Sequence, residues 1–210
     1  MAVKPILFNT EMVRAILDGR KDATRRIVKG FIPNDAVWGY TAFTPKGYIS
    51  CRGTFADGYG EKFFKLPCEP GNILYVRETW KKAPNGYYYY EDWQKNVIAD
   101  VTKWKPSIHM PKEAARIWLK VTNVRVERLQ DITQKGAESE GVGNLFYDDI
   151  GYGEKNYGTE VDTEYGIAKE QFAWLWESTI KKSDLDRYGW DANPWVWVIE
   201  FERCEKPEGV

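Results

Sequence analysis

The alternation of apolar and polar residues across positions 114–130 constrains the fold more than any other feature of this sequence. Ile117 and Leu119 fall on one side of the pattern, which resumes at Val124. A period of two places alternate side chains on opposite faces of a strand. We therefore expect a long strand here, kinked near Asn123, and a fold built around the sheet that contains it.

The remaining strands are expected where apolar runs lie between turn residues. They are residues 3–8, a hairpin over 36–55 around Thr44-Pro45-Lys46-Gly47, residues 73–80, the tyrosines 87–90, and residues 194–201.

Three helices are expected between these strands. The first follows a cap at Asn9 or Thr10 and ends at Gly19. The second covers 131–141, and the third covers 167–181, with one apolar side. This order of elements predicts a mixed α+β fold, a single domain over 1–210, around a strongly bent sheet or small barrel. We expect the first and last strands to pair.

Composition excludes several classes of protein. The 30 Lys and Arg residues nearly balance 31 Asp and Glu residues, which rules out a strongly basic nucleic-acid binder but leaves room for a local basic groove. Apolar runs are too short to span a bilayer, and the first residues lack the apolar core of a signal peptide. We therefore expect a cytoplasmic protein without a membrane partner.

Metal chemistry is not expected. The three cysteines, Cys51, Cys68 and Cys204, lack metal-binding spacing, and His109 is the single histidine. We expect no metal and no cofactor. Unless His109 is catalytic, any hydrolysis must use Lys, Thr, Ser, Asp, Glu or Tyr side chains.

A polar cluster, Gly19-x-Lys21-x-x-Thr24-x-Arg26, follows the first helix. A lysine ammonium can orient an anion or a carbonyl group, and a threonine hydroxyl can act as a nucleophile where a neighbour accepts its proton. An arginine can clamp a phosphate or a base edge. The alternative is a solvated basic loop without a function.

A second group of candidate residues lies at the end of the apolar strand expected at 73–80: Arg77, Glu78 and Trp80. Neighbouring strand residues point to opposite faces, so Arg77 or Glu78 is expected to face inward. A buried carboxylate needs a cationic partner, for which Lys21 is a candidate. The alternative is a purely structural ion pair.

A third group lies in the segment 105–111, where two prolines restrict a short loop. The loop presents Ser107 and His109, and Arg116 follows on the next strand. We expect these side chains to face the same cleft, although a single histidine is often only structural.

Five motifs together resemble the ASCH family, within the PUA-like superfamily of small β-barrels, and in particular the ASCH-type proteins of phages and prophages. The stretches around 84–104 and 143–165 match least and are interpreted as insertions. The motifs are Gly19, Lys21, Thr24 and Arg26; Pro70-Gly71 with residues 73–80; residues 106–111 leading to Arg116; Asp131-Ile132-Thr133 with Glu140-Gly141-Val142; and residues 193–198.

The resemblance implies a PUA-like small mixed β-barrel with flanking helices and a cleft that binds a nucleoside or single-stranded RNA. The chain is also similar to bacterial amidohydrolases that remove the acetyl group from N4-acetylcytidine. Carried over residue by residue, their catalytic set falls on Lys21, Thr24 and Glu78. Thr24 would then attack the acyl carbonyl or position the attacking water, and Lys21 would accept the hydroxyl proton and stabilise charge. Glu78 would hold Lys21 and pass the proton to the leaving amine.

Further contacts are expected around this cleft. Two other functions are alternatives to an amidohydrolase. The first is a non-catalytic module that binds RNA, and the second is a phage accessory protein that binds a host protein through its aromatic insertions. Substrate contacts are expected from Arg26, Arg77, Trp80, Trp38, Ser107, His109 and Arg116, and nucleic-acid contacts from Arg25 and Lys29.

Overall fold

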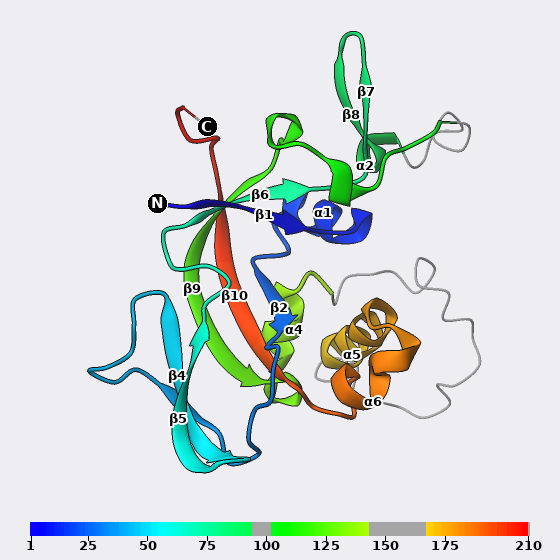
Figure 1. The fold of residues 1–210 in the computed structure, drawn as a ribbon. Coiled ribbons are helices and arrows are strands. Elements are labelled where there is room, and N and C mark those ends of the chain that lie inside the picture. Colours follow the sequence, from blue (N-terminus) through cyan, green and yellow to red (C-terminus); the bar gives the residue numbers. More distant parts are fainter. Residues whose placement is uncertain (94–101, 143–166, 210) are drawn as a thin grey trace, which may run out of the picture.

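A five-stranded sheet forms the centre of the protein. The computed structural model describes residues 1–93, 102–142 and 167–209. Strands β1 and β6 are parallel, and every other neighbouring pair is antiparallel (Figure 1). The sheet order is β1 (Val3–Leu7), β6 (Ile73–Arg77), β9 (Trp118–Arg128), β10 (Trp195–Cys204) and β2 (Ala23–Ile27).

The fold is mixed α+β, as predicted, but this sheet is open, with β1 and β2 as its two edge strands. A PUA-like barrel is therefore not confirmed. The expected pairing of the first and last strands is wrong, because β10 pairs with β2 and β9 and β1 pairs with β6.

The antiparallel pair of β9 and β10 is the longest strand pair of the main sheet. The register shifts so that Glu200 faces Asn123 while Phe201 faces Val121, which leaves Thr122 as an extra residue. Such a bulge bends and twists a strand. The kink predicted near Asn123 is thus confirmed, one residue away.

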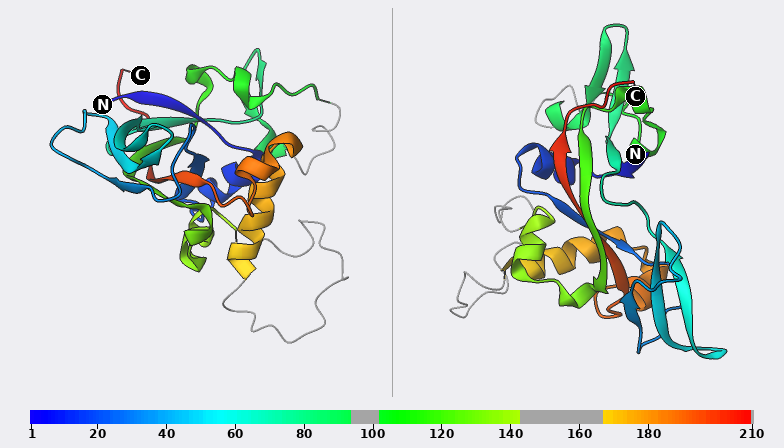
Figure 2. Two further views of the ribbon diagram at one scale, coloured as in Figure 1. Left: turned by 60° about the horizontal axis from the view of Figure 1, so that its bottom comes forward. Right: turned by 90° about the vertical axis from the view of Figure 1, so that its left-hand side faces the viewer.

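Two smaller sheets lie at opposite ends of the molecule (Figures 1 and 2). At one end, β3 (Val37–Gly39), β4 (Tyr48–Phe55) and β5 (Gly58–Lys65) form an antiparallel sheet that includes the predicted hairpin. At the other end, β7 (Trp80–Ala83) and β8 (Gly86–Tyr89) form a hairpin that projects beyond the main sheet. Of the tyrosines 87–90 expected in a strand, 87–89 belong to β8 and Tyr90 begins α2 (Tyr90–Trp93).

Helices and short 3₁₀ turns complete the structure. Asn9 caps α1, since its side chain accepts from the Met12 amide, and Thr133 caps α4 through the Gly136 amide. The helices are α1 (Thr10–Leu17), α2 (Tyr90–Trp93), α4 (Gln134–Ser139), α5 (Ile167–Thr179) and α6 (Leu185–Tyr188), and the 3₁₀ turns are η1 (Ser107–His109), η2 (Lys112–Ala114), η3 (Leu129–Asp131) and η4 (Lys182–Asp184).

Two apolar clusters fix where the functional segments lie. The larger one contains Val13 and Ile16 of α1 together with the inner face of the main sheet. The second packs α4 and α5 against the sheet, and Phe172 and Trp176 on the predicted apolar side of α5 are buried in it. Helices α1 and α5 are thereby held near β2, which carries the polar cluster of the sequence.

The polar cluster is not a solvated loop. Residues 23–27 form strand β2, in which Thr24 pairs with Ile199 and Arg25 with Val198 of β10. Lys21, Thr24 and Arg25 are each at most 4% exposed. Charged side chains are seldom buried without partners, so each needs a specific contact inside the protein.

Of the two predicted insertions, only part is described. Residues 84–93 and 102–104 belong to the hairpin and its surroundings, whereas 94–101 and 143–166 lie outside the described residues. Within the described ranges, no helix has both the length and the apolar character needed to cross a membrane. Nor does this part of the chain bring three or more His, Cys, Asp or Glu side chains together as metal ligands.

Replacing Gly141 by alanine is expected to destabilise the protein more than the same change at Gly19. Both glycines have a positive φ, +90° and +73° respectively, which costs a residue with a Cβ about 1–2 kcal/mol. At Gly141 the new Cβ would also lie 2.6 Å from the Ala15 Cβ, whereas at Gly19 it would meet nothing within 4 Å. Overpacking adds about 1–3 kcal/mol. Urea denaturation of both variants measures the difference, and equal losses would contradict the close packing at Gly141.

Candidate functional site

Lys21 enters the protein because the segment after α1 pairs with the end of α4. The amides of Arg20 and Lys21 both donate to the Ala15 carbonyl, and the Asp22 amide donates to the Ser139 carbonyl. A β-bridge joins Lys21 to Glu140. This pairing turns the Lys21 side chain inward, where it is fully buried.

The Lys21 ammonium is completely satisfied. Its Nζ donates to the Ala23 carbonyl at 2.8 Å, the Glu140 carbonyl at 2.9 Å and Glu140 Oε2 at 2.7 Å. An ammonium has three protons, so this set uses all of them. Burial lowers the pKa of Lys21, although the Glu140 carboxylate opposes that effect.

Glu140 connects Lys21 to a second buried cation. Its Oε1 accepts from Arg25 Nη1 at 3.1 Å, and Arg25 also donates to Glu127 Oε1 through Nε at 2.9 Å and Nη2 at 2.7 Å. The four side chains carry two positive and two negative charges, so the cluster is neutral. The role of Arg25 as an RNA contact stays a prediction, and its guanidinium is already bound to two carboxylates.

Arg26 lies next to this cluster and covers Thr24. Its Nη1 donates to Thr24 Oγ1 at 2.7 Å and to the Arg25 carbonyl at 2.9 Å, and its Nη2 donates to the Leu7 carbonyl at 3.0 Å. The guanidinium also lies 5.4 Å from the centroid of the Phe8 ring. Among the described residues, Arg26 thus donates hydrogen bonds only to neutral oxygens, and the nearby Glu140 carboxylate acts on its charge without a hydrogen bond: burial lowers the pKa of Arg26 and Glu140 opposes this.

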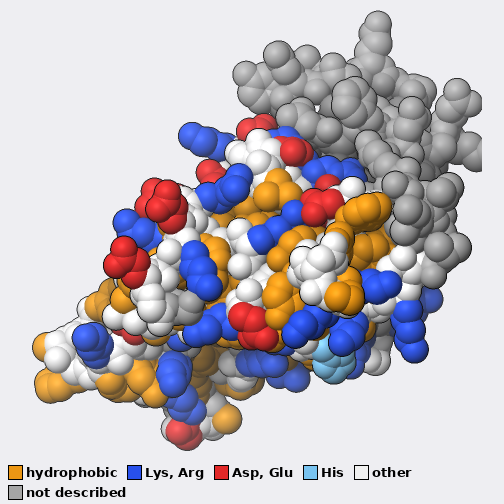
Figure 3. Space-filling view, turned by 90° about the horizontal axis from the view of Figure 1, so that it is seen from above, with side chains coloured by type: hydrophobic (Ala, Val, Ile, Leu, Met, Phe, Trp, Pro, Cys, Tyr) orange, Lys and Arg blue, Asp and Glu red, His pale blue; other side chains and the backbone are white. Residues whose placement is uncertain are grey.

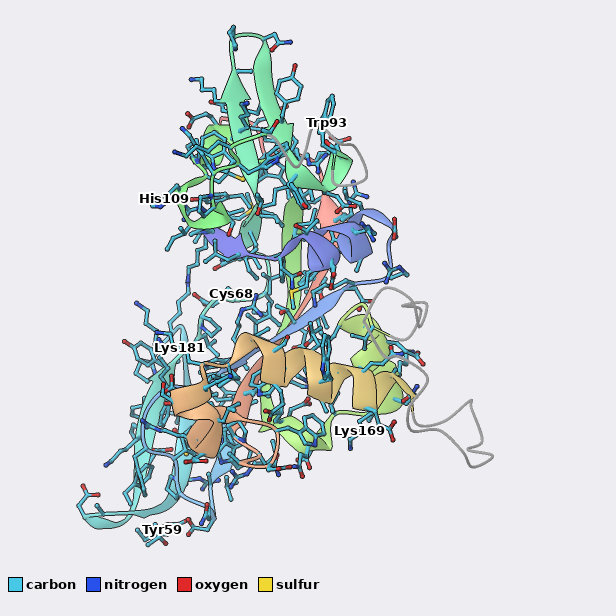
Figure 4. All side chains as sticks on the ribbon, turned by 90° about the vertical axis from the view of Figure 1, so that its right-hand side faces the viewer. Tyr59, Cys68, Trp93, His109, Lys169 and Lys181 are labelled. Atoms are coloured by element: carbon cyan, nitrogen blue, oxygen red, sulfur yellow. The ribbon has the colours of Figure 1, made fainter. Side chains whose placement is uncertain are left out.

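A cleft of about 480 Å³ opens beside Arg26. Helices α1 and α5 and the end of β1 border it; Figure 4 shows α5 with Lys169 and Lys181 labelled near its ends. Lys21 and Thr24 are not part of its lining, whereas Arg26 and Glu140 are. The lining is Leu7, Phe8, Asn9, Met12, Arg25, Arg26, Ile27, Thr79, Ser107, Glu140, Phe172, Leu175, Trp176, Thr179 and Ile180.

Glu78 does not meet Lys21, so that expected ion pair is wrong. Its Oε1 and Oε2 accept from Nε and Nη2 of Arg116, both at 2.9 Å, and Arg116 Nη1 donates to both oxygens of Asp92 at 2.8 Å. Burial raises the pKa of Glu78 even though Arg116 opposes this. The carboxylate that holds Lys21 is Glu140.

The loop after β7–β8 reaches the cleft through one residue. Ser107 is in the cleft lining, while His109 is exposed nearby in η1. Arg77 Nη2 donates to the Ile108 carbonyl, which attaches the loop to the end of β6. The structure therefore brings Arg25, Arg26 and Ser107 to one cleft and leaves Arg116 in a separate ion pair.

The expected stacking tryptophans are packed elsewhere. Trp80 is 5% exposed and belongs to a small core with Met110. Trp38 packs edge-on against Phe64 at 5.1 Å between ring centroids and against Trp195 at 5.7 Å. Neither is among the residues that line the cleft. Lys29, just beyond β2, is exposed.

Sequence reasoning missed the residues that complete the cleft: Phe8, Glu140 and the aromatic side of α5. The sequence did contain a pattern that pointed to Glu140, because Glu140-Gly141-Val142 is part of one of the motifs that carry the family resemblance. Only the β-bridge between Lys21 and Glu140 shows that these two motifs meet.

Comparisons of the chain with models of protein families, with curated proteins and with solved structures give no match.

Stability is expected to rise with pH towards 10.5 because of Lys21. Since its pKa is lowered in the folded protein, Lys21 binds fewer protons there than in the unfolded chain, between the lowered value and the ordinary value of 10.5. The free energy of unfolding then increases with pH across that interval. Urea denaturation at a series of pH values below 10.5 should give a more positive slope of the unfolding free energy with pH in the natural chain than in Lys21→Met. The buried thiols of Cys51 and Cys68, whose pKa values are raised to about 11, lower the slope of both proteins alike above about pH 9. The exposed Lys29→Met is the control, and an unchanged slope in Lys21→Met would contradict the assignment.

Proposed function

We propose that the cleft between α1, β2 and α5 binds a nucleoside or single-stranded RNA. The observation that carries this proposal is the Arg26 guanidinium, which lies against Phe8, hydrogen bonds to neutral oxygens and borders a largely apolar cleft. An apolar, partly aromatic lining suits the faces of a base, and an arginine suits a base edge or a phosphate. The volume of about 480 Å³ falls in the range of small-molecule sites.

A second activity at the same cleft is hydrolysis of an N-acylated base such as N4-acetylcytidine. The specific observation in its favour is the buried pair of Lys21 and Glu140, in which Lys21 Nζ also donates to the carbonyl of Ala23, the residue before Thr24. Lys21 donates to Glu140 as an ammonium in the structure, so it must give up one proton before it can act as a general base; burial, which lowers its pKa, eases that loss. Glu140 replaces Glu78 in this set because it is the carboxylate that holds Lys21.

The reaction would proceed through an ester on Thr24. Thr24 Oγ1 attacks the acyl carbonyl, the Lys21 amine takes the hydroxyl proton, and the same proton passes to the departing N4 amine of the base. Water then cleaves the ester, which releases the acid and restores the threonine hydroxyl. Arg26 must leave Thr24 Oγ1 for the attack, since it donates a hydrogen bond to that oxygen in the structure.

Acetate release from N4-acetylcytidine by the purified protein tests the hydrolysis. Lys21→Ala, Thr24→Ala and Glu140→Gln are each expected to lower the rate by about 100-fold or more. Glu78→Gln is expected to retain the rate per folded molecule, because Glu78 binds Arg116 outside the cleft. Thr24→Ser keeps a hydroxyl and should retain part of the activity. Rates that are unchanged in all three cleft variants would reject the mechanism.

Binding is tested separately by calorimetric titration with cytidine. Arg26→Ala is expected to weaken the affinity by about 10-fold, because it removes the unmatched charge and one wall of the cleft. Arg52→Ala, an exposed arginine on β4, should leave the affinity unchanged. Equal affinities for the natural chain and Arg26→Ala would place the nucleoside elsewhere.

A further inference from the structure

A second pocket lies away from the cleft, beside the projecting hairpin. Its volume is about 200 Å³, and it is open to solvent. Figure 4 shows Trp93 at the end of the molecule that carries the hairpin, far from Tyr59 at the opposite end. Its lining consists of Lys81, Ala83, Tyr88, Trp93, Thr102 and Trp104.

The hairpin and the chain around it build the walls of this pocket. Lys81 of β7 and Tyr88 of β8 are cross-strand partners, so their side chains share one face of the hairpin. The Trp93 ring packs edge-on against Tyr88 at 6.1 Å between centroids, and the Trp104 ring packs edge-on against Tyr90 at 5.4 Å. Contacts between rings hold large flat surfaces in fixed orientations.

The surroundings of the pocket are basic. Segments 81–83 and 102–105 contain four lysines and no acidic residue. The two acidic residues of α2 are already paired, Glu91 with Arg14 at 2.9 Å and Asp92 with Arg116 at 2.8 Å. Figure 3, which views the molecule from above, shows Lys and Arg side chains among hydrophobic side chains on this face, with Asp and Glu side chains between them. The pocket therefore attracts a ligand with a negative charge.

Aromatic walls beside lysines that form no ion pair with a carboxylate of the described residues select a ligand that is both flat and anionic. A nucleobase stacks on tryptophan or tyrosine whatever its identity, and its phosphate interacts with nearby lysines. A methylated ammonium, the other common occupant of an aromatic pocket, is disfavoured because Lys81 belongs to the lining.

We propose that this hairpin pocket, lined by Tyr88, Trp93 and Trp104 with Lys81, stacks a base of single-stranded RNA outside the cleft. The inference rests on the proposed function in that it takes the cleft ligand to belong to an RNA strand. The hairpin would then recognise a nucleotide other than the one in the cleft. It predicts that an oligonucleotide binds more tightly than cytidine alone.

Fluorescence anisotropy with a labelled oligouridylate of about 12 nucleotides tests the pocket. Trp93→Ala and Trp104→Ala are each expected to weaken RNA binding by about 10- to 100-fold. Trp93→Phe, which keeps an aromatic face, should bind within about threefold of the natural chain. Tyr59→Ala is the control, since this tyrosine is 74% exposed at the far end of the molecule.

Lys81→Glu is a second kind of variant, which tests the pocket without removing a large aromatic side chain from the fold. It should weaken RNA binding and reduce the dependence of affinity on salt. Full RNA affinity in Trp93→Ala, Trp104→Ala and Lys81→Glu would overturn the inference.

The cytidine titration separates this result from the proposed function. Tryptophan variants that lose RNA affinity but bind cytidine as the natural chain does support both proposals. If RNA affinity depends on Trp93 while cytidine does not bind the cleft, the hairpin site stands and the cleft proposal fails. If RNA affinity falls only in Arg26→Ala, the cleft stands and the hairpin proposal fails.

Discussion

The buried ion pair between Lys21 and Glu140 organises the centre of this protein. It joins the segment after α1 to the end of α4, which are far apart in sequence, and both side chains are almost fully withdrawn from water. Removing one partner of such a pair costs about 3–5 kcal/mol because the other charge is left unpaired. Arg25 and Glu127 extend the pair to a neutral cluster, so the charges inside the protein compensate one another.

Arg26 differs from the two cations of this cluster in its hydrogen-bond partners. Lys21 and Arg25 are both matched by carboxylates, whereas Arg26 donates to neutral oxygens among the described residues. The guanidinium at the cleft therefore carries charge that a ligand can use. The same guanidinium donates to Thr24 Oγ1, so the position of Arg26 determines whether that hydroxyl is covered.

Local patterns were enough to predict much of the fold. The alternation along 118–128 and the caps of α1 identified elements that the structure contains, because these depend on neighbouring residues. The pairing of strands depends on distant residues, and the expected pairing of first and last strands was wrong for that reason. In the site, Lys21 was predicted to be the cationic partner of a buried carboxylate, but that carboxylate was expected to be Glu78 and is Glu140. Glu78 and Glu140 each belong to one of the motifs that carry the family resemblance. Only the pairing of Lys21 with Glu140, which are distant in sequence, distinguishes the two carboxylates.

The open sheet leaves the outer side of β1 without a neighbouring strand among the described residues. Pro5 lies in the middle of this strand and has no amide hydrogen to offer to another chain. Proline and charged residues on edge strands oppose the addition of further strands, and Lys4 precedes Pro5 here. A sheet that does not close on itself is thus protected from uncontrolled self-association at this border by one residue that hinders backbone pairing.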